Sequence, residues 1–66
     1  MKKSFDYAIG ETVEWNGMTL VKTVQGTGEL TNQESEEIWK CKKSGKKYSP
    51  ALRFEQGLSG PDFESY

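Results

Sequence analysis

The sequence predicts a single small, mainly β domain built from two hairpins and a short helical turn. Its 66 residues suit one domain. Apolar and polar residues alternate on both sides of Asn16-Gly17, and further short segments separated by turn residues lie between residues 38 and 54. We expect residues 1–58 to form the domain. Residues 59–66 are expected to form a flexible or partner-bound C-terminal tail, because residues 57–62 have the composition of a loop.

The clearest pattern covers residues 11–25. Val13 and Trp15 alternate with polar residues before Asn16-Gly17, and Leu20 and Val24 do so after it. An Asn-Gly pair adopts two positive φ angles at low cost, which a two-residue type I′ turn requires. This segment is therefore predicted to be a β-hairpin.

Residues 30–43 allow two interpretations. A capping box of Thr31 and Glu34, acids in the first turns, lysines in the last and Gly45 as a C-terminal cap indicate a helix. The apolar residues, however, are bunched rather than spread along a helical stripe. A strand over residues 38–42, a tight turn and a return strand over residues 46–49 account for them better. We favour this second hairpin; the alternative is an α+β fold with one helix at about 32–43.

Ser49-Pro50 is expected to begin a short helical turn, followed by a last short strand at Phe54-Glu55. This order of elements resembles an SH3-like small barrel, in which a short helical turn precedes the closing strand. The resemblance covers Gly10 to roughly Leu58 and rests on element order, without a family motif. It implies a barrel-like sheet and nothing about function.

A domain of this size has a small core and a net stability of about 3–5 kcal/mol. Cys41, between Lys40 and Lys42, is expected to face inward as a small apolar residue. The apolar residues expected in the core are Ile9, Val13, Trp15, Met18, Leu20, Val24, Ile38, Trp39, Tyr48, Leu52 and Phe54.

The composition excludes most catalytic arrangements. With no histidine and one cysteine, a single chain cannot supply a zinc site, a Ser-His-Asp triad or a Cys-His pair. We expect no enzyme activity, no catalytic residue, no metal and no cofactor. No apolar stretch approaches the 18 residues of a spanning helix, so no membrane contact is expected. The lone cysteine fits a reducing, cytoplasmic compartment.

Nine basic and ten acidic residues give a net charge of −1, but the charges are unevenly distributed. Basic residues with no intervening acid follow one another from residue 40 to residue 53, and two aromatic residues accompany them. Lysines near aromatic rings suit single-stranded nucleic acid, whereas lysines alone suit an acidic protein or protect a sheet edge from aggregation. The predicted partner-binding residues are Trp39, Lys40, Lys42, Lys43, Lys46, Lys47, Tyr48 and Arg53.

These observations favour a non-catalytic binding module that acts through protein–protein interaction, as an adaptor or an inhibitor of another protein. The alternative is a nucleic-acid-binding domain that uses the lysine-rich stretch 40–53. The sequence leaves the partner and the oligomeric state open.

Overall fold

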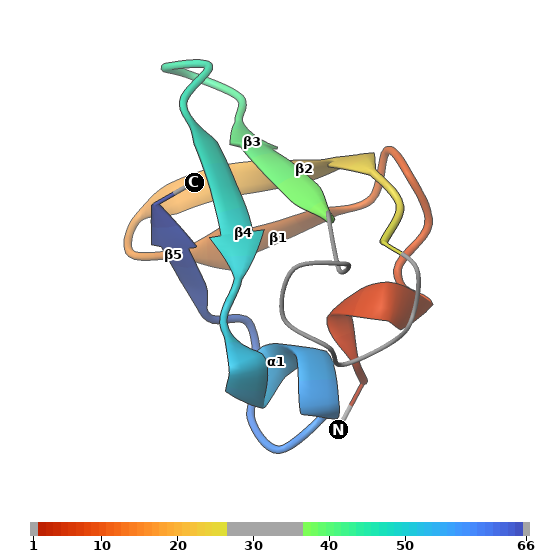
Figure 1. The fold of residues 1–66 in the computed structure, drawn as a ribbon. Helices are drawn as coiled ribbons and strands as arrows, with labels where there is room; N and C mark the ends of the chain where they lie inside the picture. Colours follow the sequence, from red (N-terminus) through yellow and green to blue (C-terminus); the bar gives the residue numbers. More distant parts are fainter. Residues whose placement is uncertain (1, 27–36, 66) are drawn as a thin grey trace.

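The computed structural model describes residues 2–26 and 37–65, and its strands form one antiparallel sheet curled into a half-barrel (Figure 1). The five strands follow one another in the order β1-β2-β3-β4-β5. The mainly β prediction is confirmed. The elements are η1 (Ser4–Asp6), β1 (Thr12–Trp15), β2 (Met18–Val24), β3 (Ile38–Cys41), β4 (Lys47–Pro50), α1 (Leu52–Gln56) and β5 (Phe63–Ser65).

The first hairpin joins β1 and β2 as predicted. Asn16 and Gly17 both have positive φ angles, of 49° and 74°, as a type I′ turn demands. Trp15 pairs with Met18 directly across this turn. The two-residue turn thereby sets the register that directs Val13 and Leu20 into the core.

The second hairpin joins β3 and β4, so the helix proposed for residues 32–43 is wrong over residues 38–43, which form a strand and a turn. Residues 32–36 lie outside the described residues. The strand forms because Trp39 and Cys41 alternate with Lys40, which places the two apolar side chains on the inner face and the lysine outside.

The end of the chain differs from the prediction. The helical turn begins later, at Leu52, and occupies the position expected for a strand at residues 54–55. The closing strand is instead β5, which pairs with β4 within the predicted tail. Phe63 explains this difference, because its side chain is 4% exposed and packs edge-on against Trp15 and Trp39. Residues 63–65 of the segment expected to be a flexible or partner-bound tail thus form a strand of the sheet.

The core fills the concave side of the sheet and is closed at one end by α1 and η1 (Figure 1). Three expected core residues are instead exposed: Ile9, Val24 and Leu52, at 61%, 40% and 57%. The short helix directs Phe54 inward, which leaves Leu52 in solvent. Among the described residues, no helix is long and apolar enough to cross a membrane. The core cluster consists of Val13, Leu20, Trp39, Cys41, Tyr48, Phe54 and Phe63.

Candidate functional site

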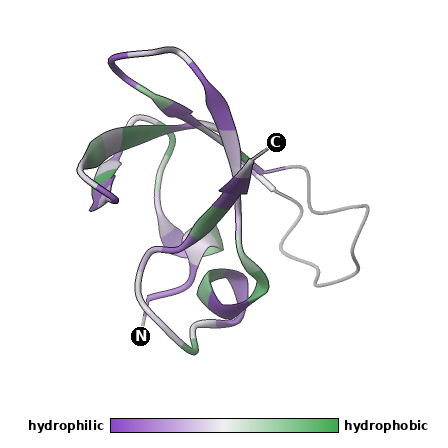
Figure 2. Cartoon of the chain, turned by 90° about the vertical axis from the view of Figure 1, so that its left-hand side faces the viewer, coloured by the Kyte–Doolittle hydropathy of each residue, from purple (hydrophilic) through white to green (hydrophobic). Residues whose placement is uncertain are grey.

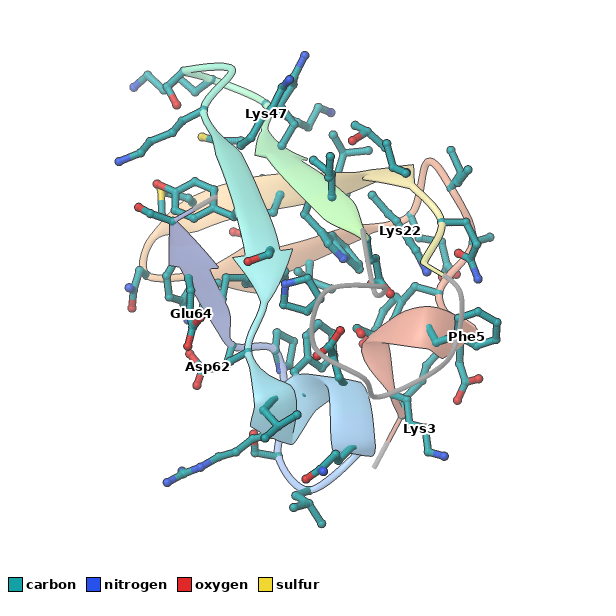
Figure 3. All side chains as sticks on the ribbon, in the orientation of Figure 1. Lys3, Phe5, Lys22, Lys47, Asp62 and Glu64 are labelled. Carbon is teal, nitrogen blue, oxygen red and sulfur yellow. The ribbon has the colours of Figure 1, made fainter. Side chains whose placement is uncertain are left out.

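The tip and outer face of the β3–β4 hairpin carry a group of exposed lysines, which we call the basic hairpin surface. The hairpin projects from one end of the half-barrel, and Figure 2 shows it as a mainly hydrophilic extension. Figure 3 shows Lys47 at this end, whereas Asp62 and Glu64 lie along β5. The surface consists of Lys40, Lys42, Lys43, Lys46 and Lys47, all exposed.

Lys40 and Lys47 lie directly opposite each other in the β3–β4 ladder. Both point outward because their neighbours Trp39 and Tyr48, also a directly opposed pair, point into the core. Like charges in directly opposed positions repel each other across the strands. Within residues 2–26 and 37–65, no lysine of this surface forms an ion pair; the two ion pairs there involve Lys2 and Lys22. The positive charge of the surface is therefore uncompensated.

Hydrogen bonds fix the turn that carries the lysines. The Cys41 N–H donates to the Lys46 carbonyl at 2.9 Å, and the Gly45 N–H donates to the Cys41 carbonyl at 2.8 Å. The Lys42 N–H donates to the Thr19 carbonyl at 3.0 Å, which ties the turn to β2. Gly45 has a φ of 77°, which a residue with a side chain adopts only with strain. The lysines thus extend from an ordered backbone.

The structure brings only part of the predicted site together. Trp39 is fully buried and Tyr48 is 8% exposed, so both rings belong to the core. Arg53 lies on α1, at the end of the molecule opposite the hairpin tip (Figure 1). The structure therefore separates Trp39 and Arg53 from the lysines, whereas the Tyr48 ring lies 5.6 Å from the Lys46 ammonium.

A pocket of about 540 Å³ opens between the β1–β2 turn and the β3–β4 turn. Met18 lies on one side, and its sulfur accepts a weak hydrogen bond from the Tyr48 hydroxyl at 3.8 Å. Cys41 contributes from the other side and is 3% exposed, as its inward placement predicted. Hydrogen bonds from the side chain and backbone of Ser44 lower the pKa of the Cys41 thiol. The pocket is lined by Gly17, Met18, Thr19, Cys41, Lys42, Lys43 and Ser44.

The sequence analysis missed a buried polar network at the other end of the half-barrel. Lys22 is fully buried, and its ammonium lies 3.7 Å from a carboxylate oxygen of Glu37. The alternation of side chains along β2 could have predicted this burial. Leu20 faces inward, and Lys22, two positions later, lies on the same face of the strand. The Lys22 ammonium also donates to the carbonyl oxygens of Ser4, Phe5 and Tyr7, at 2.9, 3.2 and 2.7 Å.

In the part of the chain that the structure describes, no three His, Cys, Asp or Glu side chains gather in a way that could hold a metal ion. The chain matches no protein-family model, no curated protein and no solved structure.

Proposed function

We propose that this domain is a non-catalytic binding module that captures an acidic segment of another protein on the basic hairpin surface. The observation that carries the proposal is the Lys40–Lys47 pair. Directly opposed lysines destabilise a sheet, and small domains have little stability to spare. A role in binding an anionic partner accounts for the presence of both Lys40 and Lys47 in spite of this repulsion.

Protection of a sheet edge is a poor explanation for Lys40. Edge strands are commonly lined with lysine because their unpaired backbone groups can recruit another strand. Lys40 lies instead on β3, an interior strand of the five-stranded sheet. It pairs with Val21 of β2 on one side and with Lys47 of β4 on the other, so its charge has no free edge to protect.

An acidic protein fits the surface better than single-stranded nucleic acid does. Single-strand binders combine basic grooves with aromatic rings on which the bases stack. The two rings that would serve here, Trp39 and Tyr48, are buried in the core. The overall charge of −1, the carboxylate of Glu64 on β5 and that of Asp62 just before it also oppose a long polyanion. A short acidic segment, in contrast, need touch only the hairpin.

The experiment compares capture of proteins from a nuclease-treated lysate of the producing cell by three forms of the chain. These are the wild type, the double variant Lys40→Glu/Lys47→Glu, and the control Lys3→Glu, which removes an exposed lysine from the other end of the molecule. We expect one set of proteins to be retained by the wild type and the control and lost by the double variant.

Identical capture by all three forms would contradict the proposal. So would capture that depends on nucleic acid. This would appear as proteins retained from an untreated lysate but not from the nuclease-treated one, together with salt-sensitive binding to labelled RNA or DNA. The latter outcome would favour the nucleic-acid alternative. Circular dichroism of each variant establishes that the domain remains folded.

A further inference from the structure

We infer that the pocket between the two turns takes one apolar side chain of the acidic segment, so that the domain recognises an apolar anchor flanked by carboxylates. This inference rests on the proposed function and specifies its ligand. It depends on three features of the pocket: its size, its apolar floor and its charged rim.

The pocket has the volume of an ordinary ligand site, which is more than one side chain fills. Ligand pockets in proteins usually measure about 300–1,000 Å³, and this one has about 540 Å³. Because the pocket lies open between two turns, a peptide can bind across it and insert a single side chain. A Leu, Met or Phe side chain fits within this volume, with room for part of the flanking backbone.

The interior of the pocket is apolar and adaptable. Met18 is only partly buried although it packs against the core cluster, so part of its flexible thioether remains open to the pocket. Methionine fills irregular spaces and is used repeatedly at surfaces that receive apolar side chains. The Cys41 side chain and the backbone of Gly17 complete a lining on which an apolar anchor loses its contact with water.

The rim is cationic. Lys42 and Lys43 line the pocket, and both are exposed on the turn that the Lys42–Thr19 backbone bond fixes. Within the described residues neither forms an ion pair. A carboxylate beside the anchor, on the side of the β3–β4 turn, therefore meets a lysine without displacing an existing partner. Glu14 contacts Thr19 from β1 through a 2.6 Å hydrogen bond, but it does not line the pocket.

This combination of an apolar floor and a basic rim commits the pocket to one occupant, a segment of an acidic protein. None of the residues lining it is aromatic, so it offers no ring on which a nucleobase could stack. Charge complementarity selects the acidic flanks and burial selects the anchor. The two contributions can be separated by experiment.

The test uses two short synthetic peptides of glutamates that differ only at the centre, where one carries leucine and the other alanine. Binding to the full chain is measured by fluorescence anisotropy at physiological salt. Because leucine buries about three more carbon groups than alanine, we expect the leucine peptide to bind at least about tenfold more tightly. In NMR spectra of the wild-type chain, its addition should shift the amide signals of Gly17, Met18 and Thr19.

Two variants locate the effect. Met18→Gln keeps the length of the side chain but makes the floor polar, and it should bring the ratio of the two affinities close to one. The control Leu58→Gln changes an apolar side chain that is 70% exposed and lies outside the pocket, and it should preserve the ratio. The wild-type comparison and its NMR map need no variant, so they stand even if Met18→Gln impairs folding.

Equal affinities of the wild type for the two peptides would overturn the pocket inference. In that case, loss of both affinities in Lys40→Glu/Lys47→Glu would leave the proposed function intact. If neither peptide binds the wild type, both the inference and capture of an acidic segment by the basic hairpin surface are contradicted.

Discussion

Lys22 lies 3.7 Å from Glu37 inside the protein, and both side chains are buried, at 0% and 2% exposure. The Glu37 carboxylate also accepts hydrogen bonds from the Trp39 indole at 2.8 Å and the Ser4 hydroxyl at 3.3 Å. With three main-chain carbonyls around the ammonium, the network holds the N-terminal segment against β2 and the start of β3. In the described part of the chain, no buried side-chain nitrogen or oxygen lacks a hydrogen-bond partner.

Replacing Lys22 by methionine should destabilise the domain severely. The substitution leaves the buried Glu37 charge without its cation and the carbonyls around the ammonium without a donor. Breaking a buried pair in this way costs about 3–5 kcal/mol, which is comparable to the total stability of a domain this small. Urea unfolding followed by tryptophan fluorescence measures the loss.

The double variant Lys22→Met/Glu37→Gln is the control for this prediction. It removes the uncompensated charge and should recover part of the lost stability, because neutral groups cost less to bury than an isolated carboxylate. A single Lys22→Met variant as stable as the wild type would show that the network does not stabilise the fold.

The substitution Lys40→Glu should stabilise the domain while weakening binding. It converts the Lys40–Lys47 repulsion into attraction between opposite charges in the same ladder position. The expected gain is roughly 0.2–1 kcal/mol and should shrink as salt is added. Thermal unfolding at low and high salt measures it. A loss of stability would show that the opposed lysines are not a cost to the fold.

Phe63 should be required for folding although it lies within the predicted tail. Its ring packs against three aromatic rings, those of Trp39 and Phe54 in the core and of the partly buried Trp15. Phe63→Ala should therefore cost about 3–5 kcal/mol. Leu58→Ala, at a side chain that is 70% exposed, is the matched control and should cost about 0.5 kcal/mol or less. Equal effects of the two in chemical denaturation would contradict the role assigned to β5.

Glu11 should contribute to the acid stability of the domain. A 2.8 Å hydrogen bond from the Ala8 N–H lowers the pKa of this carboxyl below 4.5, and Lys2, 3.6 Å away, acts in the same direction. Because its folded-state pKa is depressed, the stabilisation is present above pH 4.5 and is lost as the pH falls through the folded pKa.

Removing the Glu11 charge tests this assignment. Glu11→Gln should lower stability at neutral pH and flatten its dependence on pH below 4.5. Unfolding free energies measured between pH 3 and pH 7 on the wild type and the variant provide the comparison. Parallel pH profiles would contradict the assignment.

Local chemistry was enough to predict both hairpins. Asn16-Gly17 specifies its turn through backbone conformation alone. The alternation of Trp39, Lys40 and Cys41 determines which of these side chains point to the inner face of the sheet, independently of the strand that pairs with them. The exposure of Lys40 followed from the same alternation. These features depend on residues close together in the chain, so the sequence contains the information that specifies them.

Other features depend on contacts between distant segments. Phe63 becomes part of the sheet because a gap among Trp15, Trp39 and Phe54 receives its ring, which no local pattern around residues 59–66 reveals. Burial of Lys22 likewise requires the carboxylate of Glu37, which is remote in sequence, because an ammonium is buried only when partners compensate its lost hydration. The mainly β class and the exposed lysines are thus properties of short stretches. The closing strand, the buried ion pair and the pocket between the turns arise only when the folded chain brings their parts together.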